Sequence, residues 1–327
     1  MKKWGMALLF GALLGLGFQP VASAAKADTA ASQKAKAGKK VKSGAKAKAA
    51  KPAKRTKAAP AKSHKSGVKK NVRRVAYEQF EPGRLALHSA SAYVIDQSSG
   101  EALVDKSSGA VLPIASISKL MTAMVVLDAK LDMQEVISIG EADVDNLKGT
   151  RSRLTVGTTM TRETAMLLAL MSSENRAAHA LGRHYPGGMT AFVEAMNHKA
   201  QALGMSNSRF EEPTGLSSNN VATARDLAKM VAAAAQYPEI RNMSTTAQAT
   251  VSLNGHLREF NNTNALVKSD NWEIGVSKTG FISEAGRCLV MQAKVAQRPV
   301  VIVLLDSVGK MTRVGDANRI KRWMERA

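Results

Sequence analysis

The sequence predicts an α+β fold in which an antiparallel sheet is flanked by helices and interrupted by an inserted all-helical subdomain. Three observations predict it: strand-like segments at 91–105, a largely helical stretch from about 141 to 237, and strands that return between 249 and 305. Strands that precede and follow a block of helices are typical of α+β folds. We therefore expect the opening strands to pair with later ones across the helical insertion.

The opening strands are expected to form a β-hairpin. Ser91–Asp96 and Glu101–Asp105 are strand-like, and the turn-forming residues Gln97-Ser98-Ser99-Gly100 separate them. A helix is then predicted from about Ser116 to Lys130, because its apolar residues recur on one broad helical face.

The remaining elements follow from the same patterns. A short strand is expected at 135–139, and helices are expected at 161–171, 174–184, 189–203 and 223–235. Later strands are expected at 249–253, 257–260, 275–279, 287–295 and 300–305, followed by a closing helix at 314–326.

Charge is spread unevenly along the 327 residues, which hold 47 Lys and Arg against 26 Asp and Glu and have a formal net charge of +21. Residues 25–76 contain 18 basic residues and a single acidic one, whereas residues 77–327 contain 27 basic and 25 acidic. The only part long enough to build a large core is therefore nearly neutral, which argues against a uniformly basic nucleic-acid-binding fold.

Residues 1–24 have the order of a secretory signal peptide. Lys2 and Lys3 precede an apolar run from Trp4 to Phe18, and Ala22-Ser23-Ala24 supplies small residues for cleavage. The apolar run is shorter than the roughly 20 residues that span a membrane. We expect export to the periplasm, in a soluble or loosely envelope-associated form.

Residues 25–76 are rich in Lys and Ala and almost free of large apolar side chains, so they predict a disordered basic arm. Export argues against nucleic acid as the target of this arm and favours anionic envelope polymers or lipids. A solvated spacer without a specific partner is the alternative.

The first chemical motif is Ser116-Ile117-Ser118-Lys119 at the start of the first long helix. Residues three apart share a helical face, so the lysine amine can reach the serine hydroxyl. Burial would lower the pKa of that amine and let it act as a base. The same serine–lysine spacing occurs at four other serines, so the motif alone is weak.

Two further motifs add selectivity. Ser173-Glu174-Asn175 falls between two predicted helices, and Lys278-Thr279-Gly280 ends a predicted strand. Ser269-Asp270-Asn271 also has the S-x-N form, but it lies only nine residues before Lys278 and would not supply a separate wall of a cleft.

With these motifs, the sequence resembles the active-site serine penicillin-recognising enzymes, which carry S-x-x-K, S-x-N and K-T-G in this order. Within them it looks like the low-molecular-mass penicillin-binding proteins, the D-alanyl-D-alanine carboxypeptidases and endopeptidases. The likeness extends over about residues 85–327 and includes Glu212-Pro213-Thr214-Gly215-Leu216. It implies a β-lactamase/DD-peptidase-like fold, with residues 77–327 as the catalytic domain and a helical subdomain at about 141–237.

The resemblance also implies roles for individual residues. Ser116 would attack the carbonyl of the penultimate D-alanine, with Lys119 as general base and Ser173 as proton relay. Asn175 would hold Lys119 and the substrate amide. The last motif would bind the substrate through Lys278, Thr279, Gly280 and Phe281, with the backbone N–H groups of Ser116 and Phe281 forming an oxyanion hole.

Several functions remain open at this point. Glu212-Pro213 matches the start of the E-P-x-L-N motif of class A β-lactamases, but the residues after it follow the peptidase pattern. The chain has 47 residues after Gly280, which favours the soluble endopeptidase branch over carboxypeptidases with a second domain. A non-catalytic wall- or polyanion-binding protein is the remaining alternative. Peptidoglycan stem peptides are the expected substrate, and β-lactams the expected covalent inhibitors.

No cofactor or metal is expected, because the histidines lack metal-ligand spacing. The single cysteine, Cys288, excludes an intramolecular disulfide and is expected to be a small buried residue. Glu174 departs from the common pattern of the family, in which many members have Asp or Gly here; it lies between two functional positions and need not matter.

Overall fold

The computed structural model describes residues 85–326. The predicted signal peptide at 1–24 and the predicted basic arm at 25–76 lie outside the described residues, as do residues 77–84 of the predicted catalytic domain. Within the described part of the chain, no helix is long and apolar enough to cross a membrane.

The strands are β1 Ser89–Asp96, β2 Ala102–Lys106, β3 Leu112–Pro113, β4 Val136–Ser138, β5 Thr159–Thr161, β6 Val221–Ala222, β7 Gln248–Leu253, β8 His256–Asn261, β9 Glu273–Ile282, β10 Gly286–Val295 and β11 Arg298–Ser307. The α-helices are α1 Ser118–Asp128, α2 Arg162–Met171, α3 Asn175–Arg183, α4 Gly188–Ala202, α5 Ala224–Ala234, α6 Pro238–Thr245 and α7 Thr312–Met324. Short 3-10 helices are η1 Ala115–Ile117, η2 Glu141–Asp143 and η3 Ala265–Lys268.

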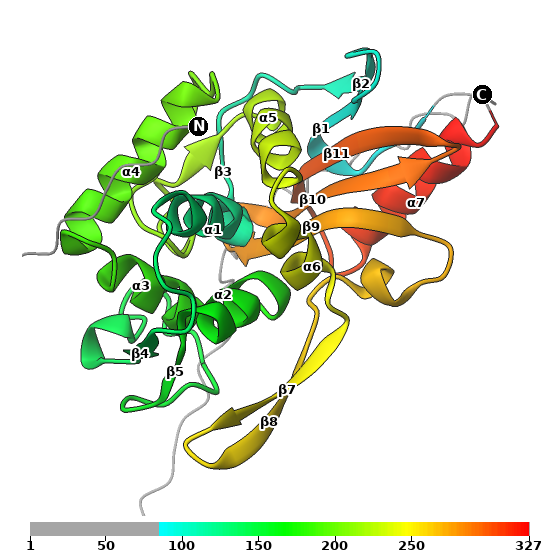
Figure 1. The fold of residues 1–327 in the computed structure, drawn as a ribbon. Helices are drawn as coiled ribbons and strands as arrows, with labels where there is room; N and C mark the ends of the chain where they lie inside the picture. Colours follow the sequence, from blue (N-terminus) through cyan, green and yellow to red (C-terminus); the bar gives the residue numbers. More distant parts are fainter. Residues whose placement is uncertain (1–84, 327) are drawn as a thin grey trace, which may run out of the picture. The chain divides into compact units, whose positions relative to one another are not determined.

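Five strands form one antiparallel sheet in the order β2-β1-β11-β10-β9 (Figure 1). β1 pairs with β11 so that Tyr93 lies opposite Val303. β10 pairs with β9 so that Leu289 lies opposite Thr279. The opening hairpin and the last three strands therefore share one sheet across the helical insertion, which confirms the predicted α+β architecture.

The two faces of this sheet carry different helices (Figure 1). Successive side chains of a strand point to opposite faces. Ile302 of β11 packs in an apolar cluster with Ile320 of α7. Val301 and Val303 belong to the larger cluster, which includes Leu227 of α5 and the buried residues of α1. The helical subdomain therefore packs against one face of the sheet only.

Helix α1 is enclosed by other elements, and its first nine residues are buried. It packs against α2, α3, α4, α5 and α6. The sequence predicted a broad apolar face, whereas the helix is buried nearly all round, as is typical of a helix at the centre of a large core. Residues at its N-terminus are therefore held firmly.

Helices α2 to α5 begin and end within one residue of their predicted limits. Their boundaries carry local signals: Thr161 caps α2 by accepting from the N–H of Thr164, and Thr223 caps α5 by accepting from the N–H of Asp226. Between and before these helices, the stretch from 141 to 237 also contains η2, β5 and β6, which the sequence patterns did not predict. The additional helix α6, with Pro238 in its first turn, has only eight residues, too few for a clear periodic pattern.

The later strands do not all join the large sheet. β7 and β8 pair only with each other, and this hairpin projects from the body of the domain (Figure 1). Asn254 and Gly255 form its turn with φ angles of 51° and 78°. Two left-handed residues suit a tight two-residue hairpin turn. The alternation of apolar and polar side chains predicted both strands, but it did not indicate that they pair with each other instead of joining the large sheet.

Candidate active site

Ser116 lies in η1, directly before α1, and Lys119 lies in the first turn of α1. Ala115 before the serine has a left-handed backbone, with φ of 50°. Ser116 is half-buried and Lys119 is fully buried. Lys119 Nζ lies 2.8 Å from Ser116 Oγ, so the three-residue spacing brings the two groups into hydrogen-bonding contact.

Lys119 is surrounded by oxygen atoms from three separate parts of the chain. Besides Ser116, it contacts Asn175 Oδ1 at 2.7 Å and the carbonyl oxygen of Thr214 at 2.6 Å. Burial lowers the pKa of Lys119 from 10.5 to about 7, against the opposing effect of the Glu212 and Glu174 carboxylates. Near neutral pH, a large share of this amine is therefore uncharged and able to take a proton from the serine.

The second motif forms the turn between α2 and α3. Ser173 has a left-handed backbone with φ of 62°, and Asn175 is the first residue of α3. The Asn175 amide nitrogen donates to Thr150 Oγ1 at 3.0 Å while its oxygen accepts from Lys119. Both ends of the amide are held, so its orientation is determined.

Lys278 of β9 joins the third motif to the second. Its amine donates to Ser173 Oγ and to the carbonyl oxygen of Thr279, both at 2.9 Å. Burial first, and then the nearby charges of Lys119 and Arg313, lower the pKa of Lys278 well below its ordinary value. A ligand carboxylate beside this amine would stabilise its protonated form.

Gly280 allows β9 to lie against the backbone of Ser116. A Cβ at this position would stand 3.0 Å from the backbone nitrogen of Ser116 and from the carbonyl oxygen of Ile114. Thr279 Oγ1 donates to Thr263 Oγ1 at 2.7 Å. Phe281 is 54% exposed, with the Arg287 guanidinium 4.5 Å from its ring centre.

The loop after α4 contributes contacts that the sequence did not predict. The Glu212 carboxylate accepts from the backbone N–H groups of Thr214 and Gly215, both at 2.6 Å, and from the Thr214 hydroxyl at 2.6 Å. Gly215 has φ of 81°, and a Cβ there would lie 1.9 Å from the Ala115 carbonyl oxygen. Glu212 thereby shapes the loop that brings the Thr214 carbonyl to Lys119. Every residue type has a backbone carbonyl, so the sequence pattern does not indicate a contact of this kind.

The structure thus brings together the residues of all three predicted motifs. The competing S-x-N match at 269–271 lies elsewhere, in the segment between η3 and β9, where Asp270 and Asn271 are exposed. Glu174, the residue between Ser173 and Asn175, is 7% exposed and binds Ser152 and Arg153. Cys288 is fully buried on β10, as predicted.

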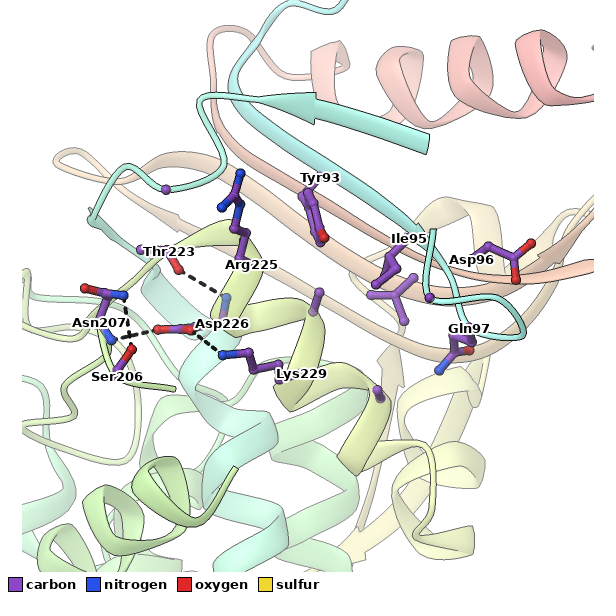
Figure 2. A pocket seen from close by; sticks show the side chains of 15 residues that line it. Tyr93, Ile95, Asp96, Gln97, Ser206, Asn207, Thr223, Arg225, Asp226 and Lys229 are labelled. Carbon is purple, nitrogen blue, oxygen red and sulfur yellow. Dashed lines mark hydrogen bonds and ion pairs between the residues drawn. The ribbon is translucent and has the colours of Figure 1, made fainter. Parts of the chain in front are cut away.

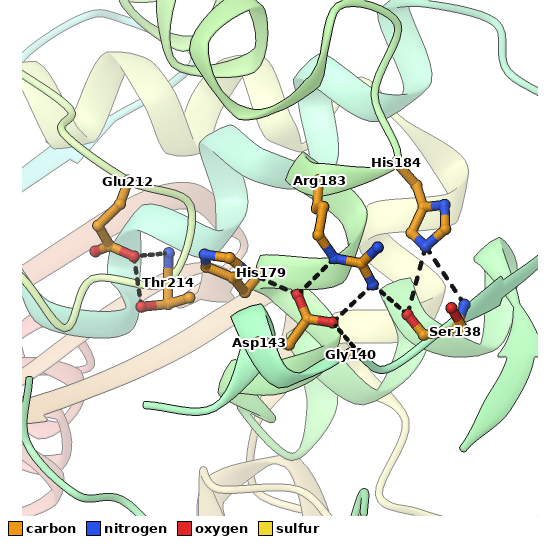
Figure 3. Close-up of polar contacts among 8 residues, drawn as sticks. All are labelled: Ser138, Gly140, Asp143, His179, Arg183, His184, Glu212 and Thr214. Atoms are coloured by element: carbon orange, nitrogen blue, oxygen red, sulfur yellow. Dashed lines mark hydrogen bonds and ion pairs between the residues drawn. The ribbon is translucent and has the colours of Figure 1, made fainter. Parts of the chain in front are cut away.

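A small cavity of about 200 Å³ borders the Asn175 and Thr214 side of this cleft. Figure 3 shows Asp143 at its edge, between His179 and Arg183. Burial tends to raise the pKa of Asp143, but hydrogen bonds from His179 and Arg183 outweigh it and lower the pKa to about 2. The carboxylate therefore ties η2 to α3.

Among residues 85–326, no group of three or more His, Cys, Asp or Glu side chains could hold a metal ion.

A larger cavity, of about 530 Å³, opens between β1 and α5 (Figure 2). Its charged side chains are paired: Asp96 with Arg298, Arg225 with Asp105, and Lys229 with Asp226. None of the eight predicted site residues lines it. The cluster around Ser116 therefore remains the candidate site for chemistry.

Comparison with known proteins identifies related peptidases. Residues 78–309 match the peptidase S11 family, described as D-alanyl-D-alanine carboxypeptidase. The chain is 50% identical over 246 residues to a D-alanyl-D-alanine endopeptidase of Pseudomonas aeruginosa, covering 75% of this chain and 79% of that protein. It is 49% identical over 239 residues to a D-alanyl-D-alanine endopeptidase of Escherichia coli, covering 72% and 77%.

Among solved structures, the fold is similar to the crystal structure of the Streptomyces K15 DD-transpeptidase. The two share 26% sequence identity with a TM-score of 0.69, over 74% of this chain and 98% of the other. The family match extends over more than two thirds of the chain, and half of the aligned residues are identical to those of a curated relative. These agreements show that the chain belongs to the S11 family of serine D-alanyl-D-alanine peptidases.

Proposed function

We propose that this protein is a D-alanyl-D-alanine endopeptidase that cleaves peptidoglycan cross-links through an acyl-enzyme on Ser116. One observation carries the assignment of the nucleophile: the buried Lys119 amine, with its pKa lowered to about 7, lies 2.8 Å from Ser116 Oγ. An uncharged amine at this distance is a suitable general base for a serine hydroxyl.

In the acylation step, Ser116 Oγ attacks the D-alanine carbonyl carbon while Lys119 takes the hydroxyl proton. The C–N bond of the cross-link then breaks, and the proton that Lys119 took from Ser116 passes through the Ser173 hydroxyl to the departing amine, which returns Lys119 to its uncharged form. Ser173 Oγ also accepts a hydrogen bond from Lys278 Nζ at 2.9 Å. Water subsequently hydrolyses the ester, which releases the free carboxylate and restores the Ser116 hydroxyl. This sequence uses only side chains and water, so it requires no cofactor.

The other predicted residues are proposed to hold the substrate. Lys278 and Thr279 would bind the carboxylate that flanks the scissile bond, and Asn175 would bind the substrate amide. The N–H groups of Ser116 and Phe281 would stabilise the oxyanion, a contribution of about 3 kcal/mol per donor. The close approach of Gly280 to the Ser116 backbone supports this arrangement.

The endopeptidase assignment is supported by the two relatives at 49–50% identity, both of which are D-alanyl-D-alanine endopeptidases. Carboxypeptidase activity is the alternative, since the family carries that description. Digestion of purified peptidoglycan followed by separation of the products tests both. Resolution of cross-linked dimers without free D-alanine supports the endopeptidase, whereas release of D-alanine from intact stem peptides identifies a carboxypeptidase. Ser116→Ala serves as the inactive control.

A class A-like β-lactamase activity is disfavoured by the surroundings of Glu212. That carboxylate accepts from backbone and hydroxyl donors of its own loop, including Thr214 and Gly215, instead of standing free to activate a water. We expect penicillin to acylate Ser116 and to leave slowly. Rapid multi-turnover hydrolysis of a chromogenic penicillin would assign the β-lactamase function instead.

Export to the periplasm is also a proposal, supported by the signal-like residues 1–24 and by a substrate that belongs to the cell envelope. Fractionation of cells that express the full chain tests it. Recovery of uncleaved protein in the cytoplasm would contradict export.

A further inference from the structure

Glu174 stands between Ser173 and Asn175, yet its side chain turns to a different part of the chain. Its Oε2 accepts from Ser152 Oγ at 2.6 Å, and its Oε1 lies 3.3 Å from Arg153 Nε. The carboxylate is almost completely buried, at 7% exposure. A buried charge of this kind is costly unless its partners are fixed, so the contact is a defined feature of the fold.

The partners of Glu174 are held in turn by neighbouring elements. Arg153 Nη1 donates to the carbonyl oxygen of Glu259 at 2.8 Å, and its guanidinium lies 3.9 Å from the centre of the Phe260 ring. Ser152 Oγ also accepts from the N–H of Leu154 at 3.0 Å. Glu174 therefore connects the turn of the second motif to the projecting β7–β8 hairpin through residues 152–154.

Residues 150–154 are also connected to Lys119, the proposed catalytic base, through two hydrogen bonds. Two residues before Ser152, the Thr150 hydroxyl accepts from the Asn175 amide nitrogen at 3.0 Å. The Asn175 amide oxygen accepts from Lys119 Nζ at 2.7 Å. A displacement of residues 150–154 would remove the support on the nitrogen side of Asn175 and let the amide rotate away from Lys119.

We propose that Glu174 is a positioning residue for the reaction: by holding Ser152 and Arg153 it fixes residues 150–154, and these orient the Asn175 amide toward Lys119. The inference rests on the proposed function, because it assigns Glu174 an effect on the acylation of Ser116. Its negative charge also favours the protonated form of Lys119 and opposes the lowering of that pKa by burial.

The test measures the rate at which purified full-length variants are acylated by a fluorescent penicillin between pH 5.5 and 9. Glu174→Ala is expected to lower the rate on the alkaline plateau about 10- to 100-fold, the size of effect that a small misplacement of a reacting group produces. Glu174→Gln keeps an acceptor for Ser152 and is expected to retain most of the plateau rate. Both variants lack the charge, so the acid limb of both pH profiles is expected to move to lower pH.

Ser152→Ala separates geometry from charge. It should reproduce the lower plateau of Glu174→Ala without moving the acid limb, and the double variant should be no slower than Glu174→Ala alone. Glu194→Ala is the matched control, since Glu194 lies exposed on α4 and should leave the profile unchanged.

The outcomes are distinct. A Glu174→Ala profile equal to that of the unaltered chain overturns the inference, as does a variant that unfolds at lower temperature while its folded fraction acylates at the normal rate and pH. Absence of acylation in the unaltered chain would instead overturn the proposed function. Acylation of the unaltered chain, with loss confined to Glu174→Ala and Ser152→Ala, supports the positioning role.

Discussion

Lys119 Nζ lies 2.7 Å from Asn175 Oδ1, so the amide of the second motif binds the amine of the first. The same amide donates from its nitrogen to Thr150. Replacement of Asn175 by alanine would remove one of the three oxygen partners of Lys119 and free the amine to move. Acylation by penicillin is expected to slow about 100-fold.

Asn175→Asp tests the electrostatic side of this contact. A carboxylate beside Lys119 favours the protonated amine, so the acid limb of the pH profile should move to higher pH. Asn242→Asp on α6, where the side chain is exposed, is the matched control. An Asn175→Asp profile that coincides with the control would show that this amide does not act on the base.

The proposed role of Lys119 as general base predicts the pH dependence of the unaltered chain. The pKa of Lys119 is lowered to about 7, and a base must be uncharged to take a proton. Acylation should therefore rise with pH and reach half of its maximum near pH 7. A rapid-quench measurement with a fluorescent penicillin gives this profile directly.

Lys119→Arg should abolish acylation over the whole range, because a guanidinium stays protonated. A profile of the unaltered chain that is flat between pH 6 and 8 would contradict the assignment of Lys119 as the base.

Gly215 is expected to tolerate no side chain. Its φ is 81°, and an added Cβ would lie 1.9 Å from the carbonyl oxygen of Ala115, the residue before Ser116. Gly215→Ala should lower the melting temperature and the acylation rate together. Gly157→Ala is a matched control, since Gly157 has φ of 85° but nothing within 4 Å of the added atom.

The control separates backbone strain from steric contact. Left-handed backbone costs an alanine about 1–2 kcal/mol, so Gly157→Ala should destabilise modestly and leave acylation unchanged. Equal effects of the two substitutions on acylation would argue against close contact between the Gly215 loop and Ser116.

Cys288 should be unreactive in the folded protein. It is fully buried on β10, and burial raises the pKa of its thiol to about 11. The thiolate is the reactive form, so little reagent should attach near pH 8. Mass spectrometry after treatment with iodoacetamide, in native buffer and in guanidinium chloride, measures this; rapid labelling in native buffer would contradict the buried position.

The basic residues at 25–76 are predicted to bind anionic envelope material. This segment carries a net charge of +17 in the sequence. Deletion of 25–76 should reduce co-sedimentation with isolated sacculi at low salt and have little effect at about 1 M salt, where the screening length falls to about 3 Å. Binding at low salt that survives the deletion would refute the prediction.

Much of the fold could be predicted from local signals. Helices α2 to α5 have periodic apolar patterns, and their limits were predicted to within one residue. Threonine caps mark the start of two of them, Thr161 for α2 and Thr223 for α5. The pairing of β7 with β8 alone could not be predicted, because side-chain alternation identifies a strand without naming its partner. The short helix α6 lacked a sufficient pattern.

The three motifs, their order and hence the candidate nucleophile can be recognised from the sequence, because those residues are defined by chemical type and short spacing. The lowered pKa of Lys119, its contact with the Thr214 carbonyl and the partners of Glu174 become visible only in the folded chain. These depend on atoms that lie 21 to 95 residues apart in the chain. Burial and backbone contacts of this range arise from packing, and no local pattern of residues encodes them.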